Sequence, residues 1–170
     1  MSKRVFQVAT FTPTATADNS ALANATYMAI GAGSATQTIN ITEIYQGGQA
    51  ATSAVNIMQF ARDLVLGATP TALAAPNGDG PVSGATAALA LPPITFVAAT
   101  TGPSRTNTAT TTRLNLTFNA AGGIVRWKPA DLTEAPQIIG QTVSISEMSL
   151  SAFTGGNVGA MGAHIMYEPL

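Results

Sequence analysis

Alternation of apolar and polar residues is the dominant pattern along this chain, and its clearest instance covers residues 36–53. Ile39 and Ile41 alternate with polar residues, which predicts a long β-strand with one buried face. The alternation would place Glu43 on the face of Ile41, and Ile44 then breaks the phase. We therefore expect a β-bulge near Glu43, or a strand that leaves the core there, followed by a turn at Gly47–Gly48.

The core of this strand recurs near the other end of the chain. Residues 38–44 (TINITEI) match residues 142–148 (TVSISEM) in residue type at each position, and a Gly-Gly pair follows each copy. The phase breaks again at Glu147, the counterpart of Glu43. We interpret the two copies as central strands of a β-sandwich. The alternative is a chance similarity between two Thr-rich strands.

Similar patterns predict further strands along the chain. Residues 113–128 have the clearest hairpin pattern, with a turn at residues 120–123. Within residues 1–20 we expect either a first strand or an extended arm that lies on a neighbouring molecule. The remaining expected strands cover residues 25–30, 94–99, 141–150 and 163–168, and residues 129–136 are expected to be a loop.

Residues 53–65 fit two kinds of element. Apolar residues recur at helical spacing behind Ser53, a good N-cap. The β-branched Val55 and Ile57, together with flanking glycines, favour a strand instead, with a change of register before Met58 and Phe60. The strand is the preferred interpretation.

Residues 67–93 predict a long connection with five prolines. A loop of this length inside a compact domain often forms an interface. It is also more apolar than a solvated linker, so we expect it to lie on protein, with Leu73, Leu89 and Leu91 as contact candidates.

About eight or nine expected strands, without helix–strand alternation, predict an all-β protein. The expected architecture is an antiparallel β-sandwich of jelly-roll type, formed by a single domain over residues 1–170. The length of the chain is sufficient for a substantial hydrophobic core.

The composition indicates a protein surface with unusually few charged residues. Hydrophobic residues make up 46% of the chain and charged residues only 9%, against about 25% charged residues in an average soluble protein. An exterior with so few charges is typical of a protein whose surface is covered by other subunits. The scattered basic residues argue against nucleic-acid binding and against a polybasic membrane anchor. The absence of cysteine excludes disulfides, and the N-terminus lacks the apolar segment of a signal peptide.

Candidate chemistry is sparse. His164 is the single histidine, and in an alternating strand it is expected to be a packing or surface residue. Glu43 and Glu147 could face each other as a glycosidase would require. The favoured alternative is structural, with each glutamate ending the buried part of its strand, capping a bulge, or pairing with an arginine across a subunit contact. We expect no catalytic residues, no metal and no cofactor.

Trp127 is the one aromatic residue flanked by cations, Arg126 and Lys128. It could be a sugar-stacking platform or an interface anchor. The favoured alternative is a core tryptophan whose basic neighbours point outward.

The segment Ile44-Tyr45-Gln46-Gly47-Gly48 leads into Thr52-Ser53, then a strand with Arg62, then the sequence TPTAL at residues 69–73 and a Pro-Asn-Gly-Asp loop. Over roughly residues 25–85 this resembles small β-sandwich structural proteins of tailed bacteriophages that decorate or cement capsids. The resemblance implies a strand at residues 53–65. It also implies a homo-oligomer, such as a trimer, on a capsid shell.

The expected function is therefore that of a virion structural protein, a capsid decoration or minor head protein assembled in the host cytoplasm. Its partners would be copies of itself and the major capsid protein. The alternative is a carbohydrate-binding module of a phage fibre or spike, using Trp127, Tyr45 or Tyr167, and a hydrolase that uses His164 is a third reading. The candidate interface residues are Trp127, Arg126, Tyr45, Glu43, Glu147, Leu73, Leu89 and Leu91.

Overall fold

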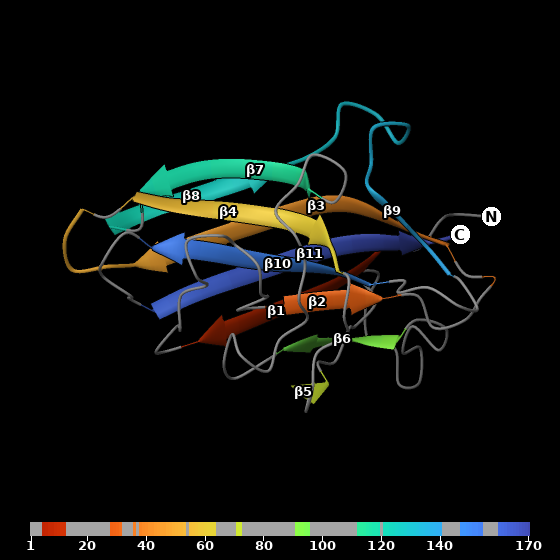
Figure 1. The fold of residues 1–170 in the computed structure, drawn as a ribbon, viewed down its shortest axis with the longest axis horizontal. Helices are drawn as coiled ribbons and strands as arrows, with labels where there is room; N and C mark the ends of the chain where they lie inside the picture. The colour runs from red at the N-terminus through yellow and green to blue at the C-terminus, as the bar shows by residue number, and fades with distance from the viewer. Residues whose placement is uncertain are drawn as a thin grey trace.

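The structure is a computed structural model of the whole 170-residue chain. It describes residues 5–12, 28–31, 36, 38–53, 55–63, 71–72, 91–95, 112–119, 121–140, 147–154 and 160–170. All regular structure in these residues is β, arranged in two antiparallel sheets (Figure 1). The expectation of an antiparallel all-β protein is thus confirmed.

The first sheet, called sheet I, has five strands in the order β1–β11–β3–β8, with β9 also pairing with β3. Strand β9 pairs with the start of β3 and β8 with its later part, so both lie along β3. The strands are β1 (Phe6–Thr12), β3 (Thr38–Gln49), β8 (Ala121–Trp127), β9 (Gln137–Ile139) and β11 (Ala160–Pro169).

The second sheet, called sheet II, has six strands in the order β5–β6–β2–β10–β4–β7. The strands are β2 (Met28–Gly31), β4 (Val55–Arg62), β5 (Thr71–Ala72), β6 (Leu91–Thr95), β7 (Thr112–Asn119) and β10 (Glu147–Thr154). Strand β3 contains the first sequence copy, and β10 begins within the second. Both strands have neighbours on both sides, as expected of central strands.

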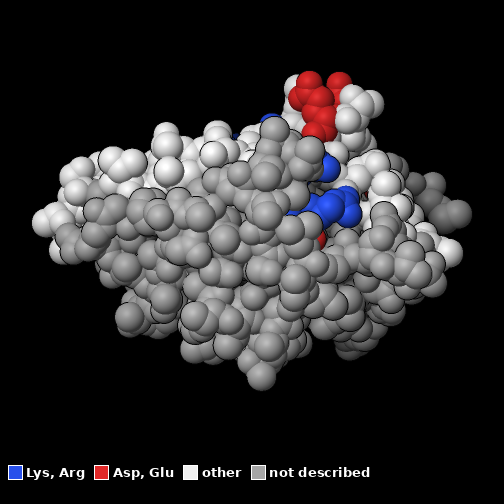
Figure 2. Space-filling view, in the orientation of Figure 1, with Lys and Arg blue, Asp and Glu red and all other residues white. Residues whose placement is uncertain are grey.

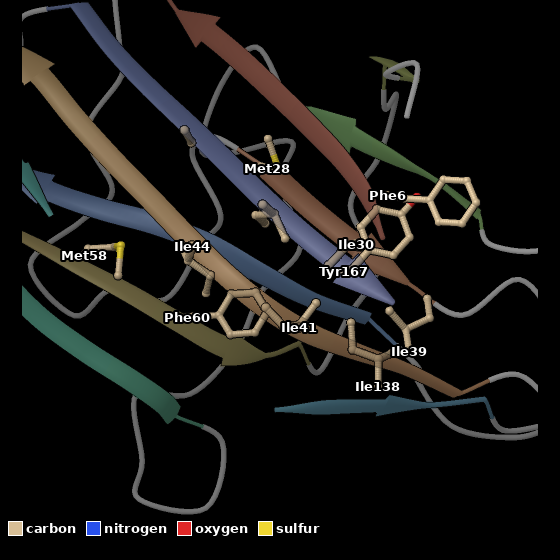
Figure 3. Packing of buried hydrophobic residues seen from close by; sticks show 12 residues of the cluster. Phe6, Met28, Ile30, Ile39, Ile41, Ile44, Met58, Phe60, Ile138 and Tyr167 are labelled. Carbon is tan, nitrogen blue, oxygen red and sulfur yellow. The ribbon is translucent and has the colours of Figure 1, made fainter. Parts of the chain in front are cut away.

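Both sheets contribute to one hydrophobic cluster (Figure 3). Sheet I supplies isoleucines from β3, together with Ile165 and Tyr167 from β11, and sheet II supplies Met28, Met58 and Phe60. The ring of Tyr167 stacks on that of Phe6, with centroids 5.8 Å apart. Because alternate residues of each strand enter this cluster, the other residues of sheet I face away from it.

The β-bulge expected near Glu43 is confirmed. Met166 of β11 pairs with Glu43, whereas the next residue, Tyr167, pairs with Ile41, so Thr42 is the extra residue. The bulge reverses the phase of β3. Ile41 points into the core before it and Ile44 after it, while Glu43 points outward.

The turn expected at Gly47–Gly48 is wrong. Both glycines lie inside β3, which continues to Gln49. Gly47 pairs with Gly162 of β11 on one side and with Ile124 of β8 on the other. A glycine inside a strand often marks a place left open for another backbone or a ligand.

The strand interpretation of residues 53–65 is confirmed by β4. Its core-facing residues are Asn56, Met58 and Phe60, in one continuous alternation, so the expected register change before Met58 is wrong. Ser53 is not a helix cap; its hydroxyl accepts a hydrogen bond from Asn119 Nδ2 at 2.9 Å.

The hairpin expected over residues 113–128 is also wrong in its pairing. Both strands exist with the expected alternation, but β7 pairs with β4 in sheet II and β8 pairs with β3 in sheet I. The turn between them therefore carries the chain from one sheet to the other. Alternation fixes which face of a strand is buried, but it says nothing about which strand lies beside it.

Other boundaries differ from expectation in smaller ways. Strand β6 begins at Leu91 and includes two prolines, which its position near the sheet edge tolerates. Strands β5 and β9 were not expected. Leu73, Leu89 and residues 142–146 of the second copy lie outside the described residues, as does most of the 67–93 connection.

Candidate binding site on the outer face of sheet I

The outer face of sheet I carries a row of side chains that the strand register places side by side. His164 pairs with Ala9 of β1 and with Tyr45 of β3, and Tyr45 pairs with Arg126 of β8. These residues alternate with core residues of their own strands, so all four point away from the core. The row therefore crosses four strands on one exposed face.

A groove lies beside this row, and glycines form its floor. Gly47 and Gly162 are direct partners on adjacent strands, and Gly48, Gly122 and Gly123 also line the space, which has a volume of about 800 Å³. Apolar side chains border it, including Met166 and Ile124, and Ile124 is 70% exposed. The complete lining is Gln7, Ala9, Tyr45, Gln46, Gly47, Gly48, Gly122, Gly123, Ile124, Gly162, Ala163, His164 and Met166.

The turn that opens β8 can be built only with glycine. Gly122 has a φ of +95°, and a Cβ on Gly123 would lie 2.0 Å from the carbonyl oxygen of Asn119. The Asn119 side chain accepts a hydrogen bond from the Ala121 amide at 2.9 Å, as in an Asx turn. Gly47 is different, because a Cβ there would meet its nearest atom at 3.5 Å, an ordinary contact.

Glu43 is the electrostatic centre of the site. Its Oε1 accepts hydrogen bonds from Arg126 Nε and from the Tyr45 hydroxyl, and the guanidinium lies over the Tyr45 ring at 5.4 Å. The hydrogen bond from Arg126 is the main reason that the pKa of Glu43 is lowered, and the bond to Glu43 raises the pKa of Tyr45. The Arg126 side chain is 57% exposed, so its other nitrogens remain accessible to an external acceptor.

His164 packs against the other side of this cluster. Its ring is tilted by 47° to that of Tyr45, with centroids 5.6 Å apart. The Nε2 atom is buried and has no hydrogen-bond partner among the described residues. No carboxylate contacts the imidazole among the described residues, and a hydrolase that uses His164 stays a hypothesis.

The predicted site residues divide into three groups. Glu43, Tyr45 and Arg126 come together in the cluster. Trp127 faces the interior and packs against the core, whereas Arg126 and Lys128 are exposed. This agrees with the favoured prediction of a core tryptophan between outward basic residues. For Glu147 and Leu91 only the backbone is described, and both lie in sheet II. Leu73 and Leu89 lie outside the described residues, so their interface role stays a prediction.

Of the paired carboxylates considered from the sequence, the structure describes the side chain of Glu43 only. Glu43 points away from the core on sheet I, and Glu147 belongs to sheet II, so the core separates the two strands. Glu43 instead pairs with an arginine of its own chain, next to the bulge. No group of three or more metal-ligating side chains occurs in the part of the chain that the structure describes.

Residues 130–135, called the acidic loop, lie within the connection from β8 to β9, which stands out from the molecule beyond β7 (Figure 1). Figure 2 shows acidic atoms gathered on this protrusion, which carries Asp131 and Glu134. Leu132 lies between them and is 46% exposed. Asp131 Oδ1 accepts hydrogen bonds from the amide and hydroxyl of Thr133, which lower its pKa.

Sequence reasoning missed the groove, because its glycines come from separate strands and the register alone aligns them. A scan of known protein families finds no match to the chain, and a search of curated proteins finds no similar sequence. The described part of the chain holds no helix with the length and hydrophobicity needed to span a bilayer.

Proposed function

We propose that this chain is a structural subunit of a virion, a capsid decoration or cement protein or a minor head protein. In this proposal the two sheets form a β-sandwich of jelly-roll type, and the subunit acts as a homo-oligomer bound to the major capsid protein. It is assembled in the host cytoplasm, and it performs no catalysis and needs no cofactor. Nucleic acid and membrane are not among its partners.

The observation that carries the proposal is the shape of the outer face of sheet I. It presents a groove with a floor free of side chains, bordered by the exposed Ile124. Grooves and exposed apolar side chains of this kind mark sites of contact with other molecules. The low charge content of the whole chain has the same explanation, because a covered surface needs few ions.

The proposed mechanism is mechanical. Contacts of standard size bury about 800 Å² on each partner, and apolar burial contributes about 25 cal/mol per Å² before the costs of association. Anything that binds only the assembled shell stabilises it by mass action. Many copies acting together would thus oppose the loss or expansion of a shell.

Imaging virions assembled with and without the chain tests this proposal. We expect added density at regular positions on the shell when the chain is present, and earlier thermal disruption of particles that lack it. An Ile124→Asp variant should bind fewer copies per particle. A chain that never copurifies with particles, and that leaves their disruption temperature unchanged, would contradict the proposal.

A carbohydrate-binding module of a fibre or spike is the second candidate, and the position of Tyr45 favours it. Tyr45 and His164 line the groove, and the exposed Arg126 lies over the ring of Tyr45. Such groups recognise sugars by stacking and hydrogen bonding. Trp127 and Tyr167 cannot serve this face because they point toward the core. Binding of purified chain to host surface polysaccharide, lost in Tyr45→Ala, would support this function, and intact particle association without any such binding would remove it.

A further inference from the structure

We propose that the acidic loop of one copy docks in the glycine-floored groove of a second copy. Leu132 would enter the groove, and Asp131 and Glu134 would lie against Arg126 and Lys128 of that copy. The inference rests on the proposed function, because that function requires a homo-oligomer and the inference names the contact that forms it.

The loop has the form of a preorganised ligand. Thr133 donates its amide to Asp131 Oδ1 at 2.7 Å, and Glu134 Oε2 accepts the Ala130 amide at 3.2 Å. Backbone hydrogen bonds from Glu134 to Asp131 and from Ala135 to Leu132 close the turn. A loop held in one shape loses little conformational freedom on binding. It presents an apolar side chain between two carboxylates.

The groove offers the complementary shape. Its floor at Gly47 and Gly162 has no side chains, and Ile124 and Met166 supply apolar borders. An aliphatic side chain such as Leu132 would fill this space and cover Ile124, which is otherwise 70% exposed. Apolar surface on both sides would thereby leave water.

Charge complementarity selects a second copy as the occupant. The loop carries two carboxylates. Exposed Arg126 of β8 lies over the ring of Tyr45, which lines the groove, and Lys128, just after β8, is exposed and near enough to Glu43 to lower its pKa. Glu43 uses only the Nε of Arg126, and no ion pair joins Lys128, Asp131 or Glu134 to another described residue. Carboxylates of the loop in one copy can therefore pair with Lys128 and with the remaining donors of Arg126 in another copy.

The two surfaces are formed by different residues of the chain. The loop comprises residues 130–135 between β8 and β9, whereas residues of β1, β3, β8 and β11 line the groove. A contact between unlike surfaces is heterologous, and repeated around an axis it closes into a ring, such as the trimer expected from the sequence.

The test is the mass of the purified full chain by sedimentation equilibrium, across concentration and salt. Leu132→Asp removes the apolar group, and Gly47→Leu fills the groove at a position where a Cβ meets only ordinary contacts. Each should raise the dissociation constant about tenfold or more. Val55→Asp is the matched control, because Val55 is 68% exposed on β4 of sheet II, and it should leave the constant unchanged.

Charge reversal provides the sharper readout. Lys128→Glu and Glu134→Lys should each weaken association, and the double variant should restore it, because the charges are again complementary. High salt should weaken the wild type, since charges are screened beyond about 3 Å at 1 M salt. Circular dichroism confirms that each variant is folded.

A monomeric wild type at high micromolar concentration would overturn the inference. So would an oligomer that survives both Leu132→Asp and Gly47→Leu, equal dissociation by Val55→Asp, or a double reversal no better than the single ones. None of these results bears on particle binding, so the proposed virion role would still be decided by imaging.

Discussion

Replacing Tyr167 with phenylalanine should stabilise the protein, although it removes a polar group from the most buried part of sheet I. Tyr167 is fully buried, and its hydroxyl has no hydrogen-bond partner among the described residues. A buried hydroxyl without a partner costs about 1–3 kcal/mol. Phenylalanine keeps the ring and its stacking on Phe6. We expect a gain of about 1 kcal/mol in the free energy of unfolding at pH 7.

The free energy of unfolding should also depend on pH in the alkaline range, because of Tyr167. Burial raises the pKa of Tyr167 from 10.0 to about 12. Above pH 10 the tyrosine ionises in the unfolded chain but not in the folded one, so stability falls as pH rises from 10 to 12. The loss is about 1.4 kcal/mol per pH unit, and at most about 2.7 kcal/mol over that interval. Tyr167→Phe should lack this part of the alkaline loss.

Urea unfolding followed by fluorescence provides the assay, because Trp127 is the only tryptophan and packs against the core. Both proteins are compared at one fixed concentration between pH 7 and 12. Tyr45→Phe is the contrasting variant, since its hydroxyl donates to Glu43, and it should lower stability at pH 7. The reasoning is refuted if Tyr167→Phe costs more than about 1 kcal/mol at pH 7, or if its alkaline loss equals that of the wild type.

Three further predictions follow from the site and the core. Glu43→Gln should lower stability by about 1 kcal/mol or less at pH 7, since its partner Arg126 is largely exposed. Because the folded pKa of Glu43 is lowered, the difference should vanish as pH falls through it, which acid-range urea curves would show. Gly123→Ala should cost about 1–3 kcal/mol through its clash with the Asn119 carbonyl, whereas Gly47→Ala should be near neutral, and equal effects would contradict the geometry. Phe60→Ala should cost about 3–5 kcal/mol by chemical unfolding, and a loss under about 1 kcal/mol would mean that Phe60 is not in the core.

The elements that the sequence predicted well are those defined by local pattern. Ile39, Ile41 and Ile44 were enough to predict a strand and the bulge beside Glu43, because a single extra residue must reverse the phase of a strand. Strand β4 was predicted despite its helical spacing because the β-branched Val55 and Ile57 favour extended backbone and the resemblance to phage structural proteins implied a strand there.

The features that sequence could not predict depend on pairing between distant segments. Strands β7 and β8 have the alternation of a hairpin, but the chain between them changes sheets. Gly47 suggested a turn because glycine is common in turns, whereas here it lies inside a strand opposite Gly162. The cluster of Glu43, Tyr45 and Arg126 was anticipated as single residues only. Their hydrogen bonds need the register of β3 against β8, which no local signal carries.

Because Thr42 is the extra residue of the bulge, β3 can lose it and keep every other pairing with β11. Deleting Thr42 would place Glu43 directly after Ile41 and still opposite Met166, so Glu43 and Tyr45 would stay outward and Ile44 would stay in the core. Deleting Glu43 together with Thr42 would instead leave one residue too few, and Ile44 would turn toward water. One codon of this strand is thus dispensable for the register, whereas the loss of two would exchange the interior with the outer face.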